Sequence, residues 1–280
     1  MAGRLDAHQH FWTRERIDRG DYPWMPGTGP MREAYTPERL APELGSAGVE
    51  GTIVVQAAES VGETRFLLEL AAATDFVVGV TGWAPLDRPE GLETLAELAA
   101  DDHLRAVRPM LHDLPDPEWI ARPDVRRSLR GLVELGLRFE VLSRTEHLAP
   151  VAGVLADIPE LPAVVDHISK PAFRWDEDGD WRDGMARLAE CPSTCCKLSG
   201  LVTEVGPGWT PADFEPYAAF VLEAFGPERV MFGSDWPVCR LAAEYGDVVR
   251  LAERLTSSLS ASEADAVWRG TAERFYLGSS

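Results

Sequence analysis

Short apolar runs alternate along this chain with segments whose apolar residues recur at helical spacing. Apolar runs of about 4 to 8 residues between glycine, proline or polar residues are typical of buried strands, and a spacing of three to four is typical of amphipathic helices. The predicted strands lie within 4–12, 51–56, 76–83, 104–110, 137–142, 162–168, 194–200 and 230–232. The predicted helices are 37–48, 63–74, 89–100, 123–135, 147–156, 180–190, 211–225, 241–255 and 260–275. This alternation predicts a series of βα units.

No linker or change of composition interrupts the series, so residues 1–280 are expected to form one domain. The fold that closes eight βα units is a (β/α)8 barrel, a TIM barrel of the α/β class, with its active site at the C-terminal ends of the strands. An open doubly wound sheet is the alternative, but no glycine-rich phosphate turn follows the first strand. The aromatic, proline-rich segment at about 11–35 predicts a long loop, either an active-site loop or a packed surface flap.

Composition and charge narrow the functional classes. The chain is 45% hydrophobic, enough for a large core, and its net charge of -19 disfavours nucleic acid and anionic membranes as partners. It contains no apolar run of about 18 residues and no signal segment. The four cysteines (Cys191, Cys195, Cys196 and Cys239) lack the spacing of a disulfide framework, which predicts reduced thiols in a cytoplasmic protein. A zinc site at Cys191, Cys195 and Cys196 is disfavoured because these residues lie in and beside an apolar strand.

Two motifs near opposite ends of the chain carry the candidate chemistry. In Asp6-Ala7-His8-Gln9-His10 the alternation of a strand points both histidines the same way, with Asp6 one step below them to orient a histidine. The pair could bind a metal ion or a polarised carbonyl oxygen, or simply cap the strand. The second motif ends the eighth strand at Asp235. Because the first and eighth strands of a barrel are neighbours, Asp235 is expected beside both imidazoles.

Other polar residues end the remaining strands. They are Gln56, Trp83, Arg108, Glu140, His167, Lys197 and Ser199, in chain order. His167 should face the same mouth, and three imidazoles with one carboxylate indicate hydrolysis of an ester, amide or lactone.

Several neighbouring residues have less certain roles. Asp166 precedes His167 in the strand pattern and is therefore expected to point to the other face, as a structural residue. Glu140 could contact substrate or form a barrel ion pair, and Lys197 could be structural or part of the site. Lys170 is expected to be solvated, and His112, in the loop after the fourth strand, is a secondary candidate for lining the pocket.

The motifs together resemble the amidohydrolase superfamily, and within it the sugar-lactonase branch of L-fuconolactonase and L-rhamnonolactonase type, related to pyrone-dicarboxylate lactonases. The stretches that carry the resemblance are 6–12, Tyr22-Pro23-Trp24, Val55-Gln56, 63–67, 166–171, 197–200 and 233–237. The resemblance implies a (β/α)8 barrel that hydrolyses a sugar-acid lactone. A decarboxylase or lactone isomerase on the same barrel, and a non-enzymatic binding protein, are the alternatives.

The resemblance also implies site roles. Asp235 would act as general base, while His8, His10 and His167 would stabilise charge on the lactone oxygen. Arg108, Gln56, Trp24, Trp83 and Trp236 would hold the sugar ring. The fourth strand lacks a lysine and the fifth lacks a histidine, so we expect one divalent ion or none, with zinc on His8, His10 and Asp235 as the metal-bound form. Because Arg108 alone supplies a strand-end arginine, a neutral lactone is favoured over a dicarboxylate. A homodimer is possible.

Overall fold

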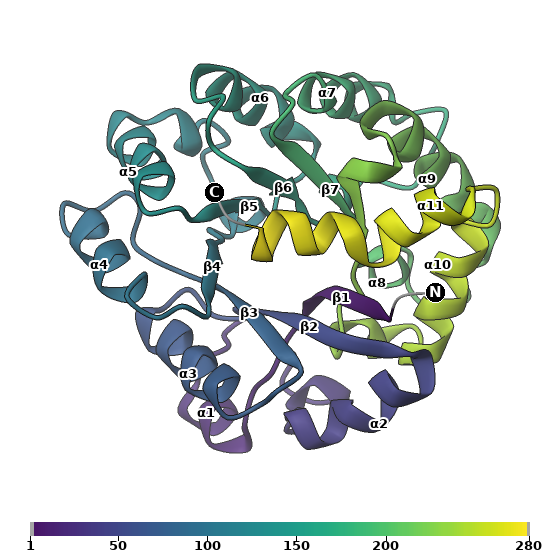
Figure 1. Cartoon of the computed structure of the whole chain (residues 1–280), viewed down its shortest axis with the longest axis horizontal. Coiled ribbons are helices and arrows are strands. Elements are labelled where there is room, and N and C mark those ends of the chain that lie inside the picture. The colour runs from purple at the N-terminus through teal and green to yellow at the C-terminus, as the bar shows by residue number, and fades with distance from the viewer. Residues whose placement is uncertain (1–2, 279–280) are drawn as a thin grey trace.

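Each strand pairs in parallel with the next one along the chain, which confirms the predicted (β/α)8 barrel. The computed structural model describes residues 3–278. Its strands are β1 (Arg4–Gln9), β2 (Val49–Val55), β3 (Val77–Gly82), β4 (Leu104–Val107), β5 (Arg138–Val141), β6 (Ala163–Val165), β7 (Thr194–Leu198) and β8 (Val230–Phe232). The order in the sheet follows the chain from β1 to β8, and Figure 1 shows the helices arranged around the strands.

The barrel closes where β8 meets β1, just beyond the end of β8. The N–H of Asp235 donates to the carbonyl of His8 over 2.8 Å, and the N–H of His10 donates to the carbonyl of Trp236 over 2.7 Å. Gly233 permits this approach, because a Cβ there would lie 2.7 Å from the Cβ of His8. The two motifs from opposite ends of the sequence are therefore joined through their backbones.

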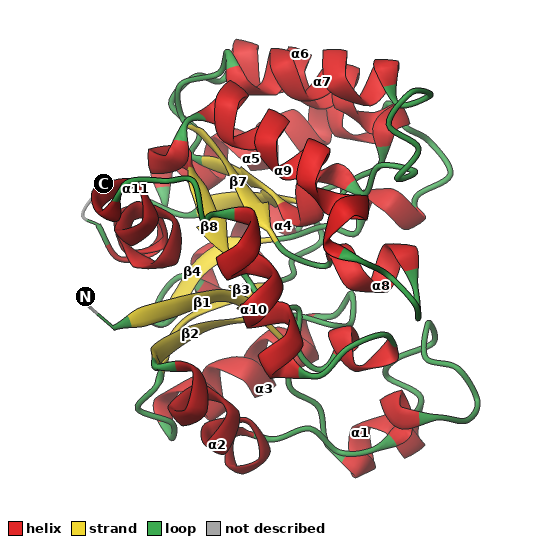
Figure 2. Ribbon diagram, turned by 90° about the vertical axis from the view of Figure 1, so that its right-hand side faces the viewer, coloured by secondary structure: helices red, strands yellow, loops and turns green. Residues whose placement is uncertain are grey.

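Helices lie on the outside of the barrel and at its two ends. They are α1 (Arg14–Arg19), α2 (Pro37–Ala47), α3 (Val61–Ala72), α4 (Gly91–Leu98), α5 (Pro123–Glu134), α6 (Leu148–Asp157), α7 (Gly179–Ala189), α8 (Leu201–Val205), α9 (Pro211–Phe225), α10 (Tyr245–Leu255) and α11 (Ala261–Asp265). Figure 2 shows α11 and both chain ends at one end of the barrel, with α1 and α8 at the other. No helix within residues 3–278 is both long and apolar enough to cross a membrane.

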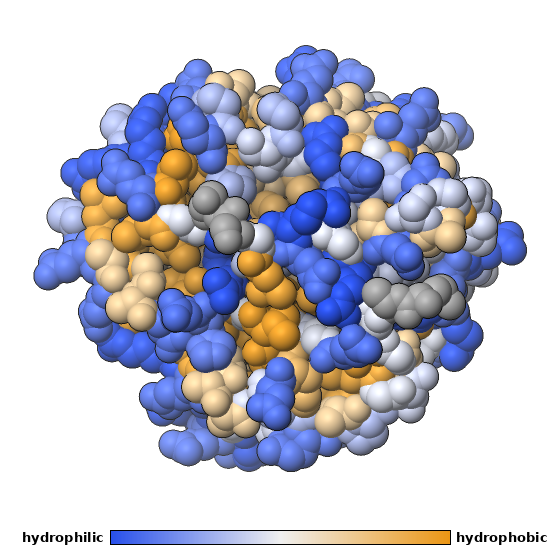
Figure 3. All heavy atoms as spheres, viewed as in Figure 1, coloured by the Kyte–Doolittle hydropathy of each residue, from blue (hydrophilic) through white to orange (hydrophobic). Residues whose placement is uncertain are grey.

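The C-terminal segment fills the end of the barrel opposite the candidate site. Residues 266–270 and 273–277 continue α11 as two π-helical turns, and Phe275 and Tyr276 pack with the barrel-interior residues Leu5, Ile53 and Val164. The Arg138 guanidinium donates to the carbonyls of Phe275 and Gly278 and anchors the segment. Figure 3 shows this face, where hydrophilic residues surround smaller hydrophobic areas.

Two predicted segments differ clearly from the structure, and one helix was not predicted. The sixth strand ends at Val165 instead of Ile168, because the backbone turns left-handed at His167. The segment 11–35 is not a pure loop: Thr13 caps the short helix α1, and Trp12, Tyr22 and Tyr35 are core residues. The helix α8 was not predicted, since its five residues are too few to show a helical period.

Candidate active site

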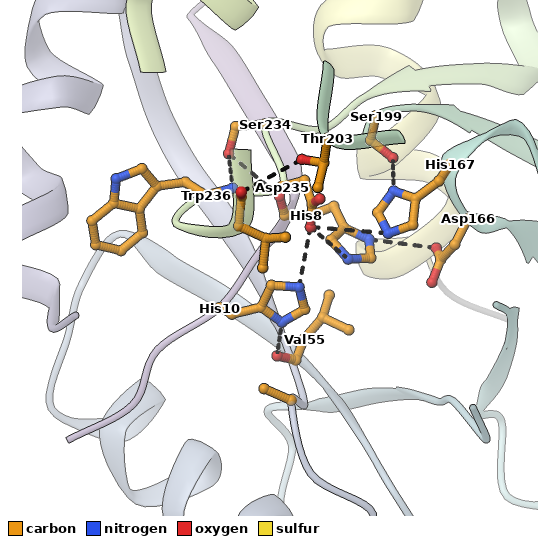
Figure 4. A network of polar contacts seen from close by, with 12 residues as sticks. His8, His10, Val55, Asp166, His167, Ser199, Thr203, Ser234, Asp235 and Trp236 are labelled. Carbon is orange, nitrogen blue, oxygen red and sulfur yellow. Dashed lines mark hydrogen bonds and ion pairs between the residues drawn. The ribbon is translucent and has the colours of Figure 1, made fainter. Parts of the chain in front are cut away.

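One carboxylate oxygen lies at the centre of three imidazole rings. Oδ1 of Asp235 is 3.3 Å from Nε2 of His10 and 3.9 Å from Nε2 of both His8 and His167. All four side chains are at most 6% exposed. Figure 4 shows the three rings directed toward the carboxylate, two from the end of β1 and one from the turn after β6. The structure thus brings together all four residues predicted to be catalytic.

An irregularity in β1 places its two histidines. From Asp6 to Gln9 the strand advances three residues while its partner β2 advances two, from Thr52 to Val54. Such a bulge turns His8 toward the barrel axis and breaks strict alternation. Asp6 therefore does not lie below the histidines. Its carboxylate instead accepts the backbone N–H groups of His8 and Ser234 and the hydroxyl of Tyr245 on α10.

The prediction for Asp166 was wrong. Its Oδ1 lies 3.4 Å from Nδ1 of His8, and its Oδ2 lies 3.1 Å from the Arg108 guanidinium, so it belongs to the site. Alternation applies only to extended backbone, whereas residues 167–170 all have positive φ. Gly200, itself at φ +68, makes room for this turn: a Cβ there would lie 2.4 Å from Nδ1 of His167. Such strained backbone clusters at functional sites.

The charges of the cluster suit base chemistry. Burial would raise the pKa of Asp235, but His167, His10 and Lys170 outweigh burial and hold that pKa below its ordinary value. Burial, and then Lys197, lowers the pKa of His8 well below its ordinary range. Burial also lowers the pKa of His167 to about 4, although Asp235 opposes the shift. At neutral pH an ionised carboxylate therefore faces neutral rings of His8 and His167.

The donor atoms fit one divalent ion. The donor atoms of His8, His167 and Asp235 lie within 4.8 Å of one another, and neutral imidazoles with an ionised carboxylate are typical zinc ligands. The Val55 carbonyl, 2.7 Å from Nδ1 of His10, makes that nitrogen the donor. In a neutral ring the Nε2 lone pair of His10 then faces the Asp235 oxygen, and two acceptors so close call for a proton or metal ion between them. The sequence predicted His10 as a metal ligand together with His8 and Asp235. In the structure it is His167 whose donor atom lies close to those of His8 and Asp235.

A buried network of charges lies against His8. Nζ of Lys197 is 2.7 Å from Oε2 of Glu140 and 3.1 Å from Oδ1 of Asp166, and all three side chains are fully buried. The Arg108 guanidinium donates to Asp166 and approaches Nε2 of His8 at 3.3 Å. Glu140 is thus an ion-paired barrel residue, and Lys197 contacts the site. Pairing and hydrogen bonding are what make such buried charges tolerable.

A cavity of about 190 Å³ opens onto the cluster. Its lining comprises His10, Trp24, Ala57, Arg108, Met110, His112, Asp113, Leu142, His167, Lys170, Asp235 and Val238. Lys170 is not solvated as predicted: it is 15% exposed and pairs with Glu204 over 2.7 Å. His112 does line the pocket, and burial followed by Lys170 lowers its pKa to about 2. Met110, Leu142 and Val238 were missed, because nothing in the sequence marks an apolar pocket residue.

Three predicted substrate contacts lie outside this lining. The fully buried Gln56 side chain donates to the carbonyl of Arg108. The indole of Trp236 packs edge-on against Tyr35 and points away from the histidines, as Figure 4 shows. Trp83 uses its backbone N–H to bind Thr64. Arg108 and Trp24 are the predicted contacts that do line the cavity.

The fold and the site together define a (β/α)8 barrel whose candidate catalytic groups gather at the strand ends. The model of the amidohydrolase family matches residues 5–277, so the chain belongs to this family. An L-fucono-1,5-lactonase of Burkholderia multivorans is 39% identical over 98% of this chain and 96% of that protein. The L-fucono-1,5-lactonase of Burkholderia ambifaria is also 39% identical, over 88% of this chain and 84% of its own. A zinc-bound amidohydrolase from Burkholderia multivorans superposes with a TM-score of 0.90 at 38% identity, covering 99% of both chains.

Proposed function

We propose that the protein is a lactonase that hydrolyses the ring ester of a sugar-acid lactone, with L-fucono-1,5-lactone as the first candidate. The observation that carries this proposal is the placement of Asp235 Oδ1 among three imidazoles at the base of a small cavity. The 39% identity to two L-fucono-1,5-lactonases over most of the chain supports the substrate class. The decarboxylase and isomerase alternatives have no comparable support.

The residues divide the reaction between them. Asp235 takes a proton from water, and the resulting oxygen nucleophile attacks the lactone carbonyl carbon. His8, His10 and His167 surround the position where negative charge develops on the carbonyl oxygen. When the ring C–O bond breaks, the ring oxygen receives the proton held by Asp235. Water is thus consumed, and the product is the open hydroxy acid.

A divalent ion, with zinc as the first candidate, would be held by His8, His167 and Asp235. When bound, it would act as a Lewis acid that polarises the lactone carbonyl. The fit rests on the two neutral rings and the ionised carboxylate described above.

The pocket favours a neutral substrate. Arg108 and Lys170 line the cavity, but each is already paired with a carboxylate: Arg108 with Asp166 over 3.1 Å and Lys170 with Glu204 over 2.7 Å. A lactone that carries extra carboxylates would need unpaired cations to offset the loss of its hydration. The hydroxyl groups of a sugar lactone need only hydrogen-bond partners, which these ion pairs still offer.

The test is a pH-indicator assay over a panel of lactones. The panel would contain L-fucono-1,5-lactone, other aldonolactones and a pyrone dicarboxylate, each with and without a chelator. Acid release from a neutral aldonolactone, faster than its spontaneous hydrolysis, is the expected result. If no lactone releases acid and a dihydroxybenzoate releases carbon dioxide, the decarboxylase alternative would replace the lactonase proposal.

A further inference from the structure

A second set of metal-type donor atoms lies on the other side of the His8 ring from the Asp235 cluster. It consists of a ring nitrogen of His8 on β1, a carboxylate oxygen of Glu140 on β5 and a carboxylate oxygen of Asp166 after β6. Nδ1 is the His8 nitrogen on this side, 3.4 Å from Oδ1 of Asp166. The three atoms lie within 4.8 Å of one another, and all three side chains are fully buried. One imidazole and two carboxylates are a ligand set that divalent ions accept. The mechanism proposed above gives this set no task.

The space between the three donors is taken by an ammonium group. Nζ of Lys197 lies 2.7 Å from Oε2 of Glu140, 3.1 Å from Oδ1 of Asp166 and 3.1 Å from Nδ1 of His8. Two of these neighbours are carboxylate oxygens, which offset the charge of the ammonium, and the third is the edge of the His8 ring. Lys197 is itself fully buried on β7, so its charge cannot leave the set for solvent.

Second-layer contacts hold the set in place. Oε1 of Glu140 accepts the hydroxyls of Thr81 and Tyr276, each over 2.5 Å, and this leaves Oε2 directed at Lys197. Tyr276 belongs to the C-terminal segment that fills the opposite end of the barrel. Oδ1 of Asp166, by contrast, is buried without a well-aligned hydrogen bond from any residue in 3–278. Nζ of Lys197, 3.1 Å away, balances the charge of that oxygen without giving it a well-aligned hydrogen bond.

We propose that Lys197 is a built-in cation in a latent divalent-metal site formed by His8, Glu140 and Asp166. Its ammonium supplies the positive charge that the two carboxylates require, and it fills the volume that an ion would need. A divalent ion entering beside it would meet the charges of both Lys197 and Arg108, without enough carboxylate to offset them. Lys197 thereby limits the active site to the single metal position at His8, His167 and Asp235.

Metal counting without substrate tests this inference, whatever the enzyme hydrolyses. The probe is Co²⁺ alone, quantified per chain by equilibrium dialysis and followed by its visible absorption. Lys197→Ala removes the charge and opens the space, so we expect it to bind one Co²⁺ more per chain than the wild type. The His8 ring would release its N–H proton to solvent and bridge the two ions as an imidazolate. Lys170→Ala removes a cation that contacts none of the three donors and should bind as many ions as the wild type.

A double variant ties the extra ion to the proposed ligands. Adding Glu140→Gln to Lys197→Ala should abolish the additional ion. A folded Lys197→Ala protein, checked by far-UV circular dichroism, that binds no more Co²⁺ than the wild type would overturn the inference. If Lys197→Ala does not fold, wild-type crystals soaked in Co²⁺ decide. An anomalous peak among His8 Nδ1, Glu140 and Asp166 would contradict the inference, and no peak there supports it.

Discussion

Oδ1 of Asp235 lies 3.3 Å from Nε2 of His10, although the two residues come from opposite ends of the sequence. Their backbones are joined as well, because the N–H of His10 donates to the carbonyl of Trp236. The contact that forms the candidate active site is therefore also part of the contact that closes the barrel. The β8–β1 seam therefore also fixes the relative positions of Asp235 and His10.

Asp235→Asn should lower kcat at least a hundredfold, the smaller end of the usual contribution of about 10² to 10⁴ from a general base. Asparagine tolerates the left-handed backbone at this position, where φ is +57, so the fold should survive. The measurement is lactone hydrolysis together with circular dichroism. Asp113→Asn, which removes a partly exposed carboxylate at the cavity rim, is the control. An Asp235→Asn variant that retains wild-type kcat would rule out Asp235 as the base.

Buried His112 should make the protein less stable in acid. Its folded pKa of about 2 lies below the ordinary value of 6.5, so below pH 6.5 the unfolded chain binds a proton that the folded ring does not. The free energy of unfolding should therefore fall by about 1.4 kcal/mol per pH unit from this one group. The free energy of unfolding can be measured in urea at several pH values. Its decrease with falling pH should be smaller in His112→Asn than in the wild type, by the amount that one bound proton contributes. His103→Asn, at the surface, should follow the wild type; equal slopes in all three would contradict the prediction.

Glu204→Gln should shift selectivity toward charged lactones. Glu204 pairs with Lys170, which lines the pocket, over 2.7 Å and lies 3.7 Å from Arg144, so removing its charge leaves the Lys170 ammonium without its carboxylate partner. We expect the ratio of kcat/KM for a carboxylate-bearing lactone to that for a neutral one to rise about tenfold, or about 1.4 kcal/mol. Glu177→Gln, in an exposed pair with Arg174, provides the matched control. An unchanged ratio would show that the Glu204 charge does not set selectivity.

Trp24→Ala should weaken substrate binding more than catalysis. The indole lines the cavity, is 38% exposed, and is fixed by a 2.7 Å hydrogen bond from Nε1 to the carbonyl of Ala57. Losing this wall should raise KM about tenfold and change kcat less than about threefold, since no reacting atom is touched. Trp24→Phe keeps an aromatic ring but loses the hydrogen bond, so its KM should lie between those of the wild type and Trp24→Ala. A kcat loss larger than the KM change would assign Trp24 to the chemical step.

The local pattern of apolar and polar residues was sufficient to predict the barrel and the residues at the centre of its candidate site. Eight apolar runs separated by helical periods predicted the strands, and the neighbouring positions of the first and last strands brought Asp235 to His8 and His10. Burial on both faces makes the strands of a parallel barrel apolar throughout, so they are visible in the sequence.

The sequence alone determined the eight βα units, the pairing of the chain's two end motifs and the chemical types gathered at the strand ends. Only the tertiary structure decided that Asp166 faces the site, that Trp236 packs behind it and that Lys197 lies among three buried acceptors. Alternation describes one extended strand, and it fails where a bulge in β1 or left-handed backbone after β6 redirects a side chain. The partner of a buried charge, moreover, comes from a strand that is distant in the sequence. A local pattern contains no information about which distant residues lie close in space.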